Sequence, residues 1–410
     1  EVSAVLDSAG FERLGEGDER KLKNGGRYYV VRNMSSVIAF KTPSAKPERY
    51  MIAAAHGESP SFKIKAVPEL ADKNYIKLNV EAYGGMSLSS WLDRPLSVSG
   101  RVVIDNGESL NVRLVNIDRD SLIIPSLAIH LGRGSKNSAE LNICRDMPPM
   151  YALSESEAGI MSEIADVLGE EEKSIIGCDL MLYNRERGRI WGRNNEFISA
   201  PRLDDLQCVY ALLKGFIESG ESRDTVQTLC IFDNEEVGSG TKQGAKSDFL
   251  SSVLLRISNC FGIDYAGHMR RLNSSFLVSA DNAHAIHPNR SDAYDSENYP
   301  RIGGGVVIKY NAAQRYTTDA VSEAIFKKIC RRAGVPYQVY ANKSDIAGGS
   351  TLGNLAAEKT CVNTVDIGLA QLAMHSAYET AGNADTSYMA NAVREFYNTR
   401  LCVINDEIRI

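Results

Sequence analysis

The sequence predicts an α/β fold in which a domain with a doubly wound, mixed sheet is interrupted by an inserted, mostly β domain. Short apolar runs that end abruptly at polar residues alternate with segments of helical periodicity, the pattern of a sheet with helices on both faces. From about residue 67 to 195 this alternation stops, and short β-branched runs are separated by Gly, Pro, Asn and Asp turns. The 410 residues, 43% of them apolar, suffice for one large domain or two. We therefore expect residues 1–66 and 196–410 to form the α/β domain and residues 67–195 the insertion.

Strands are expected where an apolar run precedes a polar residue, and helices where apolar residues recur every three to four positions. The expected strands are residues 51–55, 228–232 and 276–280, and the expected helices are residues 206–217, 249–257, 320–332 and 377–397. Ser376 and Glu379 have the spacing of a capping box at the start of the last helix, whereas Gly334 and Pro336 end the helix before it.

The insertion is expected to be an antiparallel sheet. Its short β-branched runs are residues 102–104, 122–124 and 127–129, each bounded by turn-forming residues. One helix over residues 155–168 would begin with the capping-box pair Ser154 and Glu157.

Charge and composition exclude several classes of protein. The 46 Lys and Arg residues against 52 Asp and Glu residues give a formal charge of −6, spread along the chain, without a basic surface for nucleic acid or an anionic membrane. The longest nearly uncharged apolar stretches have roughly ten residues, well short of the ~20 that span a bilayer, and the chain does not begin with a signal-peptide pattern. The eight cysteines are scattered without a C-x-x-C pair, as free thiols are in a reducing compartment. We expect a soluble, cytoplasmic protein without nucleic-acid or membrane partners.

Polar residues at the carboxyl ends of the strands are the site candidates, because ligands of open α/β sheets collect there. They are His56 after MIAAA, Glu235 and Glu236 after TLCIFDN, Asp281 after FLVSA, His375 after LAQLAM, and Asp204 in APRLDD before a helix. Singly, each has an ordinary explanation, since a strand-end carboxylate is usually a solvated turn or cap and a lone His is usually structural. Together at one sheet edge they would form a negative site that is costly unless a cation neutralises it.

Mixed His and carboxylate ligands without thiolates suit Zn²⁺ or Mn²⁺, and also Co²⁺, at two adjacent positions. Neighbouring residues at a strand end project in different directions, so one of Glu235 and Glu236 can bind metal while the other faces the water. A carboxylate beside the ions is what a hydrolase needs to take a proton from water and pass it to a leaving amine.

Eight segments carry a family resemblance that extends from about residue 11 to 398. They are AAAHGESPSFKIK, YGGMSLSSWLDRPLSVSGRVV, IPSLAIHLGR, SAPRLDDLQC, IFDNEEVGSGTKQGAKS, SADNAHAIHPN, VVIKYNAAQRYTTDAVSEA and DIGLAQLAMHSAYE. In this order they resemble the motif series of the aspartyl aminopeptidase family of dinuclear zinc metallopeptidases. The resemblance implies the following roles: one metal bound by His56, Asp204 and Asp281, the other by Asp204, Glu236 and His375, and Glu235 as the general base.

The resemblance also implies a substrate pocket and an assembly. Lys309 and His284 would line the pocket, and His130 would reach the active site of a neighbouring subunit. Each subunit would hold two divalent ions, with Zn²⁺ as the expected metal and Mn²⁺ or Co²⁺ as alternatives. Family members build tetrahedral dodecamers from dimers, so we expect a homo-oligomer with residues 67–195 as the dimerisation domain.

The chain departs from the family pattern at three positions. Glu58 stands where the family usually has an Asp. That Asp would orient the imidazole of His56 from the side of the ring that faces away from the metal. Gly348 replaces a Cys, and Asp205 replaces an Asn. Neither of the last two changes removes a ligand.

The expected function is a metal-dependent aminopeptidase that removes N-terminal residues, preferably Asp or Glu, from peptides by attack of a metal-bridging hydroxide. Two alternatives stay open: the same site acting on neutral or basic N-termini or on N-acyl amino acids, and a catalytically silent oligomeric scaffold. A serine hydrolase is disfavoured because the chain has no G-x-S-x-G elbow.

Overall fold

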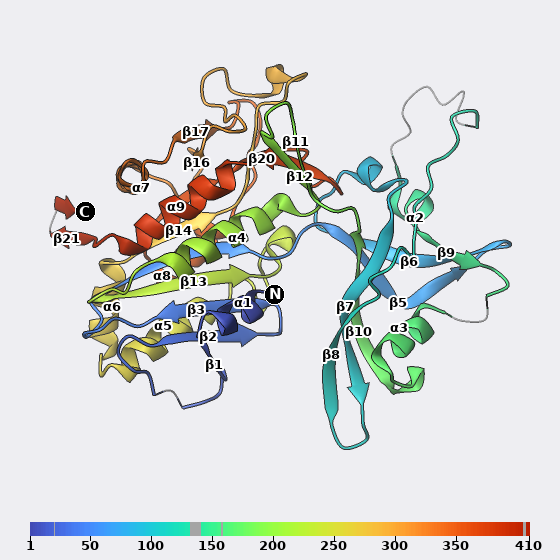
Figure 1. Ribbon diagram of the computed structural model, residues 1–410, viewed down its shortest axis with the longest axis horizontal. Helices are drawn as coiled ribbons and strands as arrows, with labels where there is room; N and C mark the ends of the chain where they lie inside the picture. Colours follow the sequence, from blue (N-terminus) through green and yellow to red (C-terminus); the bar gives the residue numbers. More distant parts are fainter. Residues whose placement is uncertain (20, 132–140, 157–158, 405–406) are drawn as a thin grey trace. The chain divides into compact units, whose positions relative to one another are not determined.

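The computed structural model describes residues 1–19, 21–131, 141–156, 159–404 and 407–410 (Figure 1). The chain forms two compact units. Unit 1 consists of Glu1–Glu58, Arg189–Met374 and Glu379–Ile410, and unit 2 of Ser59–Gly188 and His375–Tyr378. The expected boundaries, at 66/67 and 195/196, fall seven or eight residues further along the chain, and the short segment 375–378 of unit 2 has no counterpart in the expected organisation.

Unit 1 is built on a nine-stranded mixed sheet, which confirms the predicted fold class. In spatial order its strands are β1 (Glu12–Leu14), β2 (Arg27–Arg32), β3 (Ser36–Lys41), β13 (Thr225–Phe232), β4 (Arg49–His56), β14 (Phe276–Ala280), β18 (Asn363–Gly368), β16 (Val306–Tyr310) and β17 (Tyr337–Ala341). The pairs β2–β3, β3–β13 and β16–β18 are antiparallel. The other neighbours are parallel.

Helices cover both faces of this sheet. On one face pack α1 (Val2–Ser8), α4 (Leu203–Glu218), α7 (Ala320–Ala333) and α9 (Asp385–Asn398), and on the other α5 (Phe249–Cys260), α6 (Tyr265–Asn273) and α8 (Leu352–Thr360). Successive residues of β4 alternate between the two cores, with Met51 and Ala53 in one and Tyr50 and Ile52 in the other. A strand that is buried on both faces needs apolar side chains at every position, which explains its uninterrupted apolar run.

The helical periodicity located α4, α5 and α7 correctly, but the predicted helix 377–397 is wrong at its start. Glu379–Gly382 forms strand β20, and α9 begins only at Asp385. β20 pairs with β12 (Phe197–Ala200) and β19 (Ala370–Leu372). This long-range pairing overrides the local capping-box spacing of Ser376 and Glu379.

Smaller elements complete unit 1. A five-stranded sheet has the order β11 (Arg189–Trp191), β12, β20, β19 and β15 (Ala283–His284), and β21 (Cys402–Ile404) pairs with β22 (Glu407–Arg409). The 3-10 turns of the two units are η1 (Leu88–Trp91), η2 (Glu172–Ser174), η3 (Glu235–Val237) and η4 (Ser291–Ala293). Within the described residues, no helix is both long enough and apolar enough to cross a membrane.

Unit 2 contains the predicted antiparallel sheet. Its strands follow the order β8 (Leu110–Asn116), β7 (Leu96–Asp105), β10 (Ile175–Asn184), β5 (Ser61–Ala71), β6 (Tyr75–Tyr83) and β9 (Met150–Leu153), with helices α2 (Ile143–Asp146) and α3 (Ile160–Leu168). Its own core includes Phe62 and Trp91, whose rings meet edge to face at 5.2 Å.

Two predictions about unit 2 are wrong in detail. The run 127–129 forms no strand, and Leu127 and Ile129 are 70% and 75% exposed. The run 122–124 makes only isolated bridges through Leu122 and Ile123. The helix predicted over residues 155–168 is present as α3, but it begins only at Ile160, because residues 154 and 155 form a turn; Glu157 of the expected capping box lies outside the described residues.

Candidate metal centre

Three neighbouring parallel strands bring candidate residues to one edge of the sheet. β4 lies between β13 and β14 and pairs in parallel with both. His56 is the last residue of β4, and its partner in β13 is Phe232, the last residue of that strand. Glu235 and Glu236 then form the turn η3, and Asp281 directly follows β14. The carboxyl ends of the strands therefore deliver these side chains together.

Asp204 approaches from the first turn of α4. Asp204 and Asp205 have non-helical backbone angles, so the regular helix starts only after them. The Asp204 backbone N–H donates to Glu379 Oε2 in β20 at 2.9 Å. The Asp204 carboxylate then lies with Oδ1 3.4 Å from His56 Nε2.

The predicted ligands form two sets that share one residue. His56, Asp204 and Asp281 form the first set, and all three are buried. Asp204, Glu236 and His375 form the second. In each set, one donor atom per residue lies within 4.8 Å of the others. These are the same sets that the family resemblance assigns to two metals.

Glu235 belongs to neither of those sets. It lies within the same 4.8 Å limit of His56 and Glu236. A carboxylate that is close to the sets but not part of them has the place expected of a group that handles protons.

The His56 ring is oriented by Glu58. Nδ1 lies 3.0 Å from the backbone carbonyl of Glu58 and 3.6 Å from its carboxylate Oε2, which leaves Nε2 for the first set. The same carboxylate accepts a hydrogen bond from the Glu236 backbone N–H through Oε1 at 3.0 Å. Glu58 thus connects the end of β4, at His56, with the turn η3, at Glu236, although its side chain is longer than the Asp of the family.

The acids of this centre are crowded and shielded from water. Burial, the largest cause, raises the pKa of Asp281 to about 6 and that of Glu235 to about 8. Burial also raises the pKa of the Asp205 carboxyl well above its usual range. For His56, burial lowers the pKa, but the hydrogen-bonded acids beside its ring outweigh burial and raise it well above 6.5. Such a site retains protons because it lacks positive charge, and divalent cations can replace those protons.

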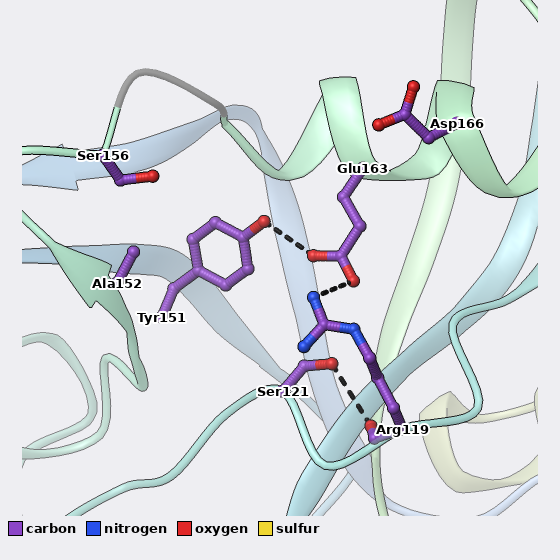
Figure 2. Close-up of a pocket in the computed structure, with 7 residues that line it drawn as sticks. All are labelled: Arg119, Ser121, Tyr151, Ala152, Ser156, Glu163 and Asp166. Carbon is purple, nitrogen blue, oxygen red and sulfur yellow. Dashed lines mark hydrogen bonds and ion pairs between the residues drawn. The ribbon is translucent and has the colours of Figure 1, made fainter.

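A pocket in unit 2 provides a contrast (Figure 2). There Glu163 accepts a hydrogen bond from the Tyr151 hydroxyl at 2.6 Å and pairs with the Arg119 guanidinium at 2.5 Å, so its charge is already balanced. Beside the candidate metal ligands, Lys309 Nζ lies 3.6 Å from Asp281 Oδ2. One lysine does not balance an acidic cluster of this size, and imidazole and carboxylate donors fit Zn²⁺, Mn²⁺ or Co²⁺.

The predicted pocket residues Lys309 and His284 lie at two ends of an aromatic cluster. Lys309 is 2% exposed, and its Nζ lies 5.4 Å from the centre of the Tyr316 ring. Burial lowers its pKa, but the neighbouring acidic groups, Asp281 foremost, together outweigh burial and raise it. The Tyr316 and Tyr340 ring centres are 6.4 Å apart, and the exposed His284 ring lies 6.2 Å from that of Tyr340.

The remaining predicted positions differ in what the structure shows of them. His130 is an exposed residue of unit 2, and residues 132–140 beside it are outside the described part, so its role stays a prediction. At Gly348, a Cβ atom would lie 2.4 Å from Asn342 Oδ1. The Cys of the family therefore does not fit this loop unless Asn342 moves.

Sequence analysis missed the polar residues that pack behind the ligands. Glu379, Gln371 and Asn282 are only 1–2% exposed and are hydrogen-bonded to one another and to Asp204. Glu379, four residues after His375, is the available signal in the sequence, but its spacing from Ser376 favours a helix cap.

Comparisons with known proteins agree with this geometry. Residues 1–397 match the family described as aminopeptidase I zinc metalloprotease (M18). A probable M18 family aminopeptidase 2 of Clostridium acetobutylicum is 44% identical over 406 residues, which cover 97% of this chain and 94% of the relative. The cryo-EM structure of the Ape4 and Nbr1 complex contains a chain with a TM-score of 0.93 and 34% identity, covering 97% of this chain and 81% of that one. The mApe1 dodecamer of S. cerevisiae gives a TM-score of 0.84 and 26% identity, covering 97% of this chain and 91% of that one.

Proposed function

The chain belongs to the M18 family of zinc aminopeptidases, which confirms the family inferred from its motifs, and we propose that it removes N-terminal residues, preferably Asp or Glu, from peptides. The observation that carries this proposal is the pair of donor sets that share Asp204. A carboxylate common to two sets is the arrangement that a dinuclear hydrolase requires.

In this proposal the two sets hold two divalent ions, Zn²⁺ in the first place. His56, Asp204 and Asp281 hold one, and Asp204, Glu236 and His375 hold the other. Bound ions of this kind polarise the scissile carbonyl and lower the pKa of water. The protein's part is to fix these side chains in position, with Glu58 keeping His56 Nε2 turned toward Asp204.

Glu235 is the general base of the proposed reaction. It takes a proton from the attacking water and gives it to the departing amine. The support is its position, because it lies within 4.8 Å of His56 and Glu236, one residue of each set, without belonging to either set.

The proposed preference for acidic N-termini depends on Lys309 and His284. The Lys309 ammonium next to Asp281 and the exposed His284 ring place groups that can carry positive charge around the Tyr316 and Tyr340 cluster. Positive charge beside the site favours an acidic side chain and disfavours a basic one.

Hydrolysis of a panel of amino-acid anilides and N-acyl amino acids, measured after addition of Zn²⁺, Mn²⁺ or Co²⁺, tests the proposal. We expect release of anilide from Asp and Glu substrates to be fastest. Faster release from Leu or Lys substrates supports the alternative specificity, and cleavage of acyl amino acids alone supports a deacylase. No turnover with any metal, in protein that also binds none, supports the silent scaffold.

We also propose that the protein is a homo-oligomer that assembles through unit 2, in which dimers build a dodecamer. Leu110, Val112 and Leu114 alternate along the edge strand β8 and are 62%, 44% and 63% exposed. Apolar side chains repeated along an exposed edge are unusual for a monomer. Light scattering coupled to gel filtration decides: a species of many subunits supports the proposal, and a monomer at micromolar concentration rejects it.

A cytoplasmic location is part of the same proposal. All eight cysteines are free, and Cys208, Cys230 and Cys330 are buried. Free thiols in this number are typical of reducing compartments.

A further inference from the structure

A buried chain of three polar side chains runs behind the ligands of unit 1. Asn282 Nδ2 donates to Gln371 Oε1 at 2.7 Å, and Gln371 Nε2 donates to Glu379 Oε1 at 3.4 Å. Glu379 Oε2 accepts the Asp204 backbone N–H at 2.9 Å. Each of the three side chains is at most 2% exposed, so these hydrogen bonds have no competition from water.

These three side chains are connected to the proposed ligands by a hydrogen bond and by the backbone. Asn282 directly follows Asp281, and Glu379 holds the backbone of Asp204. Gln371 in β19 and Glu379 in β20 precede and follow His375 in the sequence. The three side chains therefore connect the segments that carry these ligands.

The direction of every hydrogen bond in this chain is fixed at its Asn282 end. Asn282 Oδ1 accepts from the Leu369 backbone N–H at 3.3 Å, and its Nδ2 donates to the Leu203 backbone carbonyl at 3.0 Å. Neither backbone group can exchange its role, so the amide of Asn282 cannot flip. Its other N–H points at Gln371 Oε1 at 2.7 Å, the nearer of two acceptors, since Gln207 Oε1 lies 3.4 Å away. This turns the Gln371 oxygen toward Asn282 and its nitrogen toward Glu379.

At the other end the Asp204 N–H is also a donor. The residue at position 379 therefore has a donor on each side, from Gln371 and from Asp204. A carboxylate accepts twice, whereas an amide has one accepting atom and one donating atom. The N–H groups of Asn282 and Asp204 donate into this row of side chains from its two ends. One member of the row must therefore accept two hydrogen bonds and donate none, and that member is Glu379.

We propose that Asn282, Gln371 and Glu379 are positioning residues that hold Asp204 and Asp281 in the geometry for metal binding. This inference rests on the proposed ligand roles of those two residues. Residues that orient metal ligands typically change metal affinity by about 10- to 100-fold when they are replaced.

Glu379→Gln is the first test. The new amide sets its N–H group against a donor, either Gln371 Nε2 or the Asp204 N–H. Flipping Gln371 moves the conflict to Asn282 Nδ2, and flipping Asn282 as well moves it to the Leu369 N–H and the Leu203 carbonyl. We expect Co²⁺ affinity, measured by competition with a chelator, to fall by about 10-fold or more, together with a change in the visible absorption spectrum of the bound Co²⁺. Parent-like affinity and an unchanged spectrum would overturn the inference.

The double variant Gln371→Glu, Glu379→Gln is the decisive rescue. It moves the carboxylate one position along the chain, keeps the same net charge, and restores an acceptor for every donor. We expect most of the lost affinity and the parent spectrum to return. If the double variant binds Co²⁺ as weakly as Glu379→Gln, the direction of the hydrogen bonds is irrelevant and the inference is wrong.

Gln227→Glu serves as the matched control. Gln227 in β13 is 1% exposed and donates to the Tyr397 and Gly220 carbonyls. The change places a carboxylate against these two carbonyl oxygens in a buried site that is not part of the Asn282–Gln371–Glu379 network. We expect it to lower the thermal stability while Co²⁺ affinity stays the same; a loss of affinity equal to that of Glu379→Gln would count against the inference.

A second variant covers the case in which Glu379→Gln does not fold. Gln371→Leu removes the middle of the chain but leaves Glu379 on the Asp204 N–H, and we expect a smaller loss of Co²⁺ affinity from it. Parent-like affinity in this variant would reject the inference. If the parent protein itself binds no Co²⁺, the proposed function fails first; if the parent binds it and the variants bind it equally well, only the inference about positioning fails.

Discussion

The metal-free protein should lose stability as the pH rises, because its crowded acids must give up protons that the fold prefers to keep. Asp281 illustrates the sign. Its pKa is raised from 3.8 to about 6, so between these values the folded chain binds more protons than the unfolded chain, and the free energy of unfolding falls with increasing pH. Asp281 is only 9% exposed. The rise in its pKa corresponds to a loss of ~3 kcal/mol in the free energy of unfolding once the pH exceeds 6.

Two other groups act in the same direction. The pKa of Glu235, raised to about 8, extends the loss of stability toward pH 8. The raised pKa of His56 contributes stability that is present below pH 6.5 and lost as the pH rises through the folded value. Bound cations would supply the positive charge that the protons supply at low pH.

Urea unfolding of chelator-treated protein at pH 5 and pH 8, with and without Zn²⁺, measures this effect. We expect the metal-free protein to be several kcal/mol less stable at pH 8, with Zn²⁺ restoring most of the difference, and the Asp281→Asn variant to show a smaller dependence on pH. Metal-free stability that is constant or increases from pH 5 to pH 8 would show that these raised pKa values do not control the stability.

Four further predictions concern single features. Glu235→Gln should keep its metal content by elemental analysis and lose turnover by about 100-fold or more, because only proton transfer is removed; near-normal turnover would exclude Glu235 as the base. Lys309→Met should slow Asp and Glu anilides more than Leu and Ala anilides, and an equal effect on all four would reject the acidic pocket. Gly368→Ala should weaken Zn²⁺ binding, since a Cβ there would lie 2.1 Å from the Asp281 backbone oxygen. Gly17→Ala is the control, because a Cβ at Gly17 has nothing within 4 Å and should leave Zn²⁺ binding unchanged. Equal Zn²⁺ binding by the two variants would show that the close contact at Gly368 does not position Asp281. Leu110→Asp with Leu114→Asp should shift the protein to smaller species in light scattering, and an unchanged mass would remove β8 from the interface.

The parts of the fold that could be predicted are those in which a local pattern and the tertiary environment agree. β4 and β14 are buried on both faces, so their apolar runs are continuous and end where His56 and Asp281 begin the site. α7 is amphipathic and has a capping box at Asp319 and a left-handed Gly334 at its end. The grouping of His56 and Asp281 with the Glu235–Glu236 turn could be predicted because parallel strands end at a common edge.

The parts that could not be predicted depend on partners distant in the sequence. Glu379 has capping-box spacing, but it pairs with Ala200 in β12, 179 positions earlier in the chain. Gln371 and Asn282 are ordinary amides in apolar surroundings, and only their hydrogen bonds in the folded chain reveal a connection to the candidate ligands. Leu127 and Ile129 have the composition of a strand, yet they are exposed in the single chain.

The metal content of protein purified without chelator and supplied with Zn²⁺ shows whether the two donor sets bind two ions, with the Asp204→Asn variant measured beside the parent. Because Asp204 belongs to both donor sets, we predict about two zinc ions per chain in the parent and loss of both in the variant. A parent that binds no zinc, or a variant that retains both ions, would contradict the account.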